Sequence, residues 1–168
     1  MSDRSAAAAA ASRTRFLLQA AVIGAAYAAL TVALAPMGYG PVQIRFSEAL
    51  AVLPCFTPAA IPGLFVGCLV SNLVSPYGLP DLICGSAASL LAACGTWLLR
   101  RRRLLAPLPP VIANALIIGA MLYYVYGIDA SLWANALWVG CGQLVACYGL
   151  GYPLMRLLER HSGIFRLQ

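Results

Sequence analysis

The sequence predicts an all-α integral membrane protein with six transmembrane helices and both termini in the cytoplasm. Of its 168 residues, 62% are apolar and 10% are charged, and the mean hydropathy is +0.84. A soluble domain carries about 25% charged residues, so too few charges are present to cover a water-facing surface. This composition excludes a soluble enzyme, a nucleic-acid-binding domain and a secreted disulfide scaffold. The apolar stretches are also of the right length, because one helical crossing takes roughly 20 residues.

The N-terminal region divides into a polar tail and a first apolar helix. Residues 1–15 are rich in alanine and arginine and are expected to form a poorly ordered cytoplasmic tail. Residues 16–36 are the first predicted span. A cleaved signal peptide is the alternative, because Ala33-Leu34-Ala35 resembles a cleavage site. A retained helix is favoured, since the stretch exceeds the 7–15 apolar residues typical of a signal peptide and Pro36 follows the site.

The next part of the chain predicts a loop and two short helices. Residues 37–43 are rich in glycine and proline, and the apolar stretches 46–56 and 59–74 follow. Because Pro54, Pro58 and Pro62 interrupt them, we expect two short helices joined near Thr57-Pro58. The alternative is one long kinked helix, which leaves five spans. Broken backbone at membrane depth is tolerated where protein covers it or where it lines a cavity.

Three longer spans complete the predicted membrane domain, residues 16–160. A turn at 75–80 precedes the fourth span, 81–99, which ends at four consecutive arginines, Arg100 to Arg103. The proline-rich stretch 106–110 leads into the fifth span, which ends near Gly127. The sixth span runs from about Leu132 to Leu158, and residues 161–168 form a cytoplasmic tail.

The arginines set the predicted orientation. With six spans, ten of the eleven basic residues share one side of the membrane with both termini, and Arg45 alone lies on the other side. Cytoplasmic loops are enriched in positive charge, so the termini are placed in the cytoplasm of a multi-pass protein of the inner (plasma) membrane. Five spans place the C-terminal arginines outside and break this pattern.

The residue inventory gives no support for an enzyme, a metal site or a bound cofactor. There is no lysine, which a P-loop of the GxxxxGK[ST] type requires. No two of the six cysteines have CxxC spacing, and the single histidine, His161, lies in the C-terminal tail. Any energy source or nucleotide site is therefore expected on another chain.

Polar residues within the apolar spans are the candidates for substrate binding. Such residues are costly in lipid and usually face a bundle interior. Arg45 and Glu48 share a helical face, where a mutual ion pair is the alternative role. Asp81 opens the fourth span, where capping of the helix is the alternative. The candidate amides are Asn72, Asn114, Asn135 and Gln143, for most of which hydrogen bonding between helices is the alternative.

Aromatic residues add stacking surfaces to these candidates. Tyr77 and Tyr123 lie near predicted outer helix ends, where an interfacial aromatic belt is the alternative role. Trp138 lies between Asn135 and Gln143 on the sixth span. An aromatic ring flanked by amides suits a flat heterocycle.

Small residues repeat at helical spacing on two spans. Ala21, Ala25 and Ala29 form one repeat, and Gly63, Gly67 and Ser71 form another. Such faces let helices approach closely. They either pack this chain against itself or dock a membrane partner.

Four stretches resemble the QueT family of queuosine-precursor transporters. They are residues 43–50 (QIRFSEAL), 56–65 (FTPAAIPGLF), 75–81 (SPYGLPD) and 105–115 (LAPLPPVIANA). The resemblance extends over about residues 16–160. Members are substrate-binding subunits (S-components) of energy-coupling-factor (ECF) transporters.

The resemblance implies a six-helix S-component bundle with an outward-opening pocket for a deazaguanine: cyano-deazaguanine, aminomethyl-deazaguanine or queuine. It implies a transmembrane coupling subunit and two ATPases as partners, with Ala21, Ala25 and Ala29 as the docking face. The chain departs from the family at Gln143, where members often have glutamate. Glu48 or Asp81 is then expected to read the guanine edge, or the ligand differs. The alternatives are an S-component for another flat vitamin and a membrane scaffold without a ligand.

Overall fold

The computed structural model describes residues 2–38 and 44–160, and these form helices and no strand. The tail 161–168, with His161, and most of the predicted 37–43 loop lie outside the described residues. The elements in chain order are α1 (Ser2–Ala33), α2 (Ala35–Gly38), η1 (Phe46–Cys55), α3 (Ala60–Asn72), α4 (Gly78–Leu98), α5 (Leu108–Tyr124), α6 (Leu132–Leu144), η2 (Val145–Gly151) and α7 (Tyr152–Arg160).

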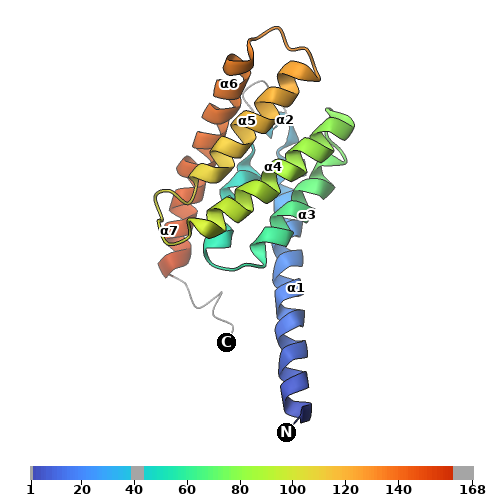
Figure 1. Cartoon of the computed structure of the whole chain (residues 1–168), viewed down its shortest axis with the longest axis vertical. Coiled ribbons are helices and arrows are strands. Elements are labelled where there is room, and N and C mark those ends of the chain that lie inside the picture. The colour runs from blue at the N-terminus through green and yellow to red at the C-terminus, as the bar shows by residue number, and fades with distance from the viewer. Residues whose placement is uncertain (1, 39–43, 161–168) are drawn as a thin grey trace.

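The helices pack in a sequential order around a central short helix. Helix α1 packs on α3, α3 on α4, α4 on α5, and α5 on α6, as Figure 1 shows. The segment η1 contacts α1, α4 and η2 and thereby closes the bundle. Helices α6, η2 and α7 follow one another without a break from Leu132 to Arg160, where the sequence predicts a single sixth span. The polar side chains of η1, Ser47 and Glu48, are buried in this packing.

The first helix is longer than the sequence predicts. Helix α1 begins at Ser2, so residues 2–15, for which a poorly ordered tail is expected, are helical in the structure. Its N-terminal half extends beyond the other helices (Figure 1). Alanine has the highest intrinsic helix propensity, so the alanine run at residues 6–11 continues the helix without tertiary support.

The two short helices predicted for residues 46–74 are confirmed. A break separates η1, a 3₁₀-helix that contains Pro54, from α3, so the single kinked helix is wrong. Thr57 stabilises the connection, because its Oγ1 accepts a hydrogen bond from the Ala59 N–H at 3.3 Å and donates to Gln19 Oε1 at 3.0 Å. In a 3₁₀-helix, side chains three residues apart lie above one another. Arg45, which immediately precedes η1, and Glu48 therefore lie on the same side of this segment.

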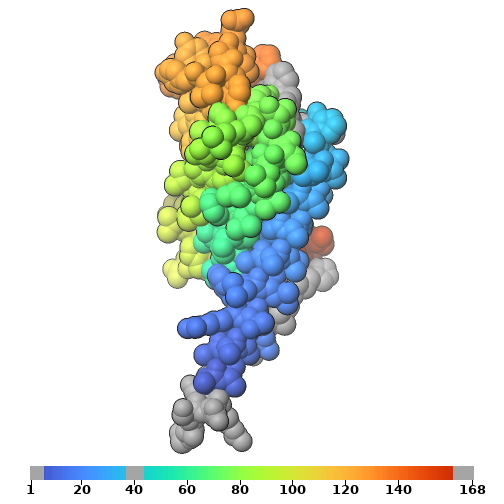
Figure 2. All heavy atoms as spheres, turned by 90° about the vertical axis from the view of Figure 1, so that its right-hand side faces the viewer, coloured from blue at the N-terminus to red at the C-terminus, as the bar shows by residue number. Residues whose placement is uncertain are grey.

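Small residues let α1 and α3 approach within backbone contact. A Cβ atom at Gly67 would lie 2.6 Å from the Gly24 carbonyl oxygen, and one at Gly63 would lie 2.7 Å from that of Ala20. Figure 2 shows the two helices side by side along one face of the molecule. The Gly63, Gly67 and Ser71 repeat therefore packs this chain against itself, which was one of the two expected roles.

Two stretches in the described part of the chain are long and apolar enough to cross a membrane. They are Ala6–Ala33 and Gly78–Leu98, while Phe46–Cys55, Ala60–Asn72 and Leu108–Tyr124 are apolar but shorter. Many large apolar side chains also point outward, among them Leu17, Val22, Ile83, Leu91 and Leu137. An apolar exterior around a partly polar interior is the arrangement expected of a protein dissolved in lipid.

We predict that Gly67→Ala lowers the unfolding free energy by about 1–3 kcal/mol, because the added methyl group collides with rigid backbone. Unfolding of the purified protein in detergent measures this change. Gly149→Ala is the matched control, since its Cβ would meet nothing closer than a Val145 methyl group at 4.0 Å. Equal unfolding midpoints for the two variants would contradict the close α1–α3 contact.

Candidate functional site

Three formally charged side chains are buried among the described residues: Arg45, Glu48 and Asp81. They come from the start of η1 and the first turns of α4. Burial of a charge in an apolar interior is costly unless it is paired and hydrogen-bonded. These residues and their hydrogen-bond partners are called the polar cluster below.

The ion pair between Arg45 and Asp81 links η1 to α4. The Arg45 Nη2 atom lies 3.0 Å from Asp81 Oδ2 and 3.4 Å from Asp81 Oδ1, and both side chains are almost completely buried. Ser75 Oγ also donates a hydrogen bond to Asp81 Oδ2 at 2.6 Å. This carboxylate therefore joins the α3–α4 turn to the start of η1.

Asn72 at the end of α3 completes this side of the polar cluster. Its Nδ2 donates to the Asp81 carbonyl oxygen at 2.9 Å and lies 3.4 Å from Cys68 Sγ. A Cβ at position 85 would lie 2.5 Å from Asn72 Nδ2, so only glycine leaves room for the amide here. The Asn72 side-chain carbonyl oxygen, Oδ1, is buried and accepts no hydrogen bond. Buried acceptors are normally paired, so this oxygen is an exception among the buried polar atoms.

Glu48 forms the second side of the polar cluster with residues of α1 and η2. The Tyr27 hydroxyl donates to Glu48 Oε1 at 2.6 Å, and beside it the Thr31 hydroxyl donates to Ser47 Oγ at 2.7 Å. The Cys147 thiol lies 3.7 Å from the Glu48 carbonyl oxygen and 3.6 Å from Gln143 Oε1. Gln143 is thereby connected to η1 through Cys147.

Two alternative roles from the sequence are settled by these contacts. The buried ion pair of Arg45 is formed with Asp81 of α4, and the pair with Glu48 on its own segment is wrong, because the Glu48 side chain turns toward Tyr27. Asp81 does more than cap a helix, because its side chain accepts hydrogen bonds from Arg45 and Ser75. Both outcomes depend on which helices become neighbours.

Within the described part of the chain, the side chains of five predicted site residues make no hydrogen bond to the buried charges. Asn114 Nδ2 donates to the Pro110 carbonyl oxygen at 3.0 Å, and Asn135 Nδ2 to that of Ala130 at 3.2 Å, so both amides bond backbone just before them in sequence. The Tyr77 ring packs edge-on against Tyr126, with ring centroids 5.1 Å apart. Two aromatic residues remain largely outside the protein interior: Tyr123 is 40% exposed and Trp138 is 52% exposed.

The structure adds residues that the sequence did not single out. Tyr27, Ser75 and Cys147 hydrogen-bond to members of the polar cluster, and Thr31 and Ser47 hydrogen-bond to each other beside it. Tyr27 and Thr31 are polar residues four apart in a mostly apolar span, a pattern that predicts an inward face. Ser75 and Cys147 carry no such signal, because serine is common in turns and cysteine is a small buried residue in most helices.

The predicted docking residues face outward from α1. Ala21, Ala25 and Ala29 are exposed, whereas Ile23, Gly24, Tyr27 and Thr31 face the bundle. Beside them lies an apolar hollow of about 420 Å³ between α1 and α3. Its lining includes Ala21 and Ala25 from α1 and Val66 and Val70 from α3.

Comparison with known proteins identifies the family. The model of the family described as QueT transporter matches residues 17–160. The chain belongs to the QueT transporter family. The members of this family are transporters, so this membrane protein is not an enzyme.

One curated relative carries a more specific name. The queuosine precursor transporter QueT of Lactococcus lactis subsp. cremoris (strain MG1363) is 33% identical over 82 residues, which is 48% of each chain. The match thus spans about half the length of this relative. No solved structure matches the chain.

We predict that Asp81→Ala lowers the unfolding free energy by about 3–5 kcal/mol, since it leaves the buried guanidinium of Arg45 without its carboxylate. Denaturation in detergent measures the loss. Asp129→Ala removes an exposed carboxylate from the α5–α6 connection and is expected to change stability by less than about 0.5 kcal/mol. A similar small change for both variants would show that the ion pair does not stabilise the fold.

Proposed function

We propose that this chain is the S-component of an ECF transporter that binds a queuosine precursor from outside the cell and delivers it inward. A partner ATPase module, formed by a transmembrane coupling subunit and two ATPases, supplies the energy. The observation that carries the proposal is the buried polar cluster within a member of the QueT transporter family. The name of the Lactococcus relative supports the choice of ligand.

The chemistry of the polar cluster matches the edge of a deazaguanine. This base presents N–H donors and a carbonyl acceptor in one plane. Asn72 Oδ1 is an available acceptor, the carboxylates of Glu48 and Asp81 are acceptors, and Arg45 is a donor. Tyr77, whose N–H donates to Ser75 Oγ beside Asp81, offers a ring for stacking at the rim of the cluster. Tyr123 on α5 and Trp138 on α6 remain predicted ligand contacts. They contact the ligand only if it extends from the polar cluster toward these two helices.

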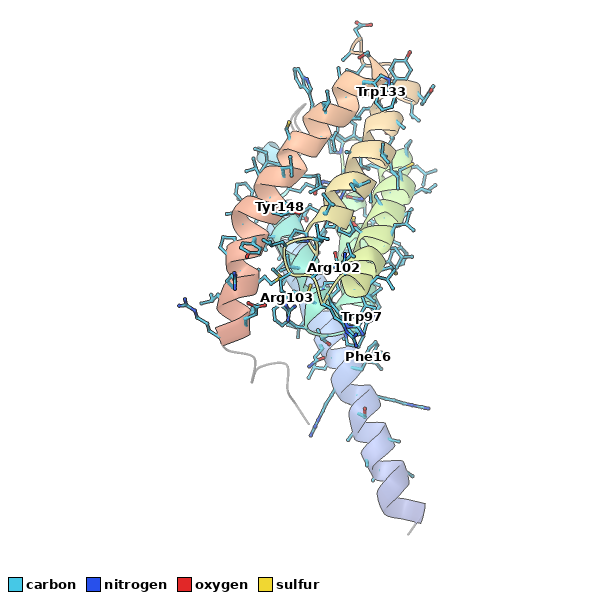
Figure 3. All side chains as sticks on the ribbon, turned by 60° about the vertical axis from the view of Figure 1, so that its left-hand side comes forward. Phe16, Trp97, Arg102, Arg103, Trp133 and Tyr148 are labelled. Carbon is cyan, nitrogen blue, oxygen red and sulfur yellow. The ribbon has the colours of Figure 1, made fainter. Side chains whose placement is uncertain are left out.

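The positions of arginines and aromatics support six spans with cytoplasmic termini. In Figure 3, Phe16, Trp97, Arg102 and Arg103 lie toward the end where α7 ends, and Trp133 lies at the opposite end. Asp81 is in the first turns of α4, far along this helix from Trp97 and the arginines that follow it. The polar cluster therefore lies nearer the end that carries fewer arginines, which the positive-inside rule assigns to the outside.

The outward alanines of α1 support the docking role. Ala21 and Ala25 line the apolar hollow between α1 and α3, and small residues at such a surface admit a partner helix closely. The scaffold alternative relies on two small-residue faces. One of them, Gly63, Gly67 and Ser71, is already covered by this chain, so the observations favour the transport function.

We predict that a deazaguanine raises the unfolding temperature of the purified protein in detergent, because a ligand that binds only the folded state stabilises it. Cyano-deazaguanine, aminomethyl-deazaguanine and queuine are titrated, with guanine as the control. The expected result is saturable stabilisation by at least one deazaguanine and none by guanine. No response to any of them would contradict the proposed ligand class.

We predict that Ala25→Leu disrupts assembly with a coexpressed coupling subunit and its ATPases, because leucine fills the hollow that the partner helix enters. Copurification measures assembly, and ligand-induced thermal stabilisation shows that the variant still folds. Ala26→Leu is the matched control, since Ala26 is exposed and does not line this hollow. Assembly of the Ala25→Leu variant at the control level would contradict this docking face.

A further inference from the structure

The buried charges of the polar cluster do not balance. Arg45, Glu48 and Asp81 are 4%, 2% and 0% exposed, and they are the formally charged side chains that the described part of the chain buries. Residues 39–43, which precede Arg45, add no carboxylate and no basic side chain. One cation thus faces two carboxylates, which leaves a net charge of −1 when all three are ionised.

The imbalance is located at Glu48. Arg45 directs its Nη2 to Asp81, at 3.0 Å, and this carboxylate also accepts from Ser75. Glu48 Oε1 accepts from the Tyr27 hydroxyl, a neutral donor, and no ion pair of Glu48 exists among the described residues. A neutral hydrogen bond leaves the negative charge in place, and the single cation nearby, Arg45, is already paired with Asp81. A buried carboxylate without an ion pair of its own is costly.

A second observation at the same cluster indicates that something else binds there. Asn72 is 1% exposed, and its Nδ2 is fixed by the Asp81 carbonyl oxygen, yet its Oδ1 accepts no hydrogen bond. A buried polar cluster is stable when every member is satisfied. Among the described residues, this cluster lacks a hydrogen-bond donor to Asn72 Oδ1 and a cationic group in direct ion-pair contact with Glu48. A ligand that carries both an N–H edge and a cation supplies the two missing partners together.

We propose that the polar cluster selects deazaguanines whose side chain carries a protonated amine, with Glu48 as the counterion of the ammonium group. Within the queuosine precursors, this assigns aminomethyl-deazaguanine and queuine as ligands and disfavours cyano-deazaguanine, whose nitrile is neutral. The inference rests on the proposed function and deepens it, since it names the charge class of the ligand. Glu48 is thus a specificity-determining residue, and Asn72 Oδ1 accepts from the base.

The test compares ligands that differ in charge and little in shape. Calorimetric titration of the full chain in detergent is carried out with aminomethyl-, hydroxymethyl- and cyano-deazaguanine. The hydroxymethyl compound is nearly isosteric with the aminomethyl compound but neutral. Loss of a buried charge partner typically lowers affinity by about 30-fold or more, so the amine is expected to bind at least that much more tightly than either neutral compound.

A pair of charge-removing variants locates the selectivity. Glu48→Gln keeps a side-chain oxygen for the Tyr27 hydroxyl but removes the charge, so it is expected to reduce the preference for the amine to less than about threefold. Asp129→Asn removes an exposed carboxylate on the α5–α6 connection, which forms no hydrogen bond with the cluster among the described residues, and is expected to keep the full preference. Thermal unfolding without ligand verifies that both variants fold. If Glu48→Gln does not fold, the comparison of charged and neutral ligands on the wild-type chain still tests the proposal.

The outcomes separate this inference from the proposed function. Equal affinity of the wild-type chain for the charged and neutral compounds overturns the charge selection and leaves the proposed function in place. A full amine preference in Glu48→Gln overturns the role of Glu48. No binding of any deazaguanine overturns the proposed function, and the inference with it.

Discussion

The buried ion pair between Arg45 and Asp81 is the interaction on which the arrangement of the remaining helices depends. Each partner needs the other, because a lone charge in an apolar interior costs several kcal/mol. The pair fixes the start of η1 against the first turns of α4. Ser75 and Asn72 attach the end of α3 and its turn to the same residue. The junction of η1, α3 and α4 is therefore built around one buried carboxylate and its paired guanidinium.

Close backbone approach is the second constraint, and it explains how a short helix fits at the centre of the bundle. Gly24, Gly63 and Gly67 bring α1 and α3 together, and Gly151 leaves space for η1, since a Cβ there would lie 3.2 Å from the Ala49 carbonyl oxygen. In lipid, apolar side chains gain little by leaving the solvent, so packing and hydrogen bonds hold helices together. In this bundle, the glycine contacts supply close packing, and the polar cluster supplies hydrogen bonds between helices.

Helix α1 presents two different faces. Tyr27 and Thr31 point inward and hydrogen-bond to Glu48 and Ser47, whereas Ala21, Ala25 and Ala29 point outward beside the apolar hollow. In the proposed transporter, the ligand site and the partner site thus share one rigid element. In that proposal, a displacement of α1 by the ligand alters the docking face, and a displacement by the coupling subunit alters the ligand site, because both sets of contacts belong to the same helix.

Composition was enough to determine the all-helical class, and proline spacing was enough to determine the break near Thr57. The rarity of polar residues in the apolar spans identified the candidate site residues. These properties are local, because each depends on a residue type and its position along the chain. The partner of Arg45 was not determined in this way: Glu48 and Asp81 are both carboxylates, and only the packing of η1 against α4 decided between them. Tyr27 and Cys147 likewise became members of the cluster through the approach of α1 and η2 to η1. Hydrogen bonds between helices are set by the relative rotation and depth of those helices, which side-chain packing fixes and no single span encodes.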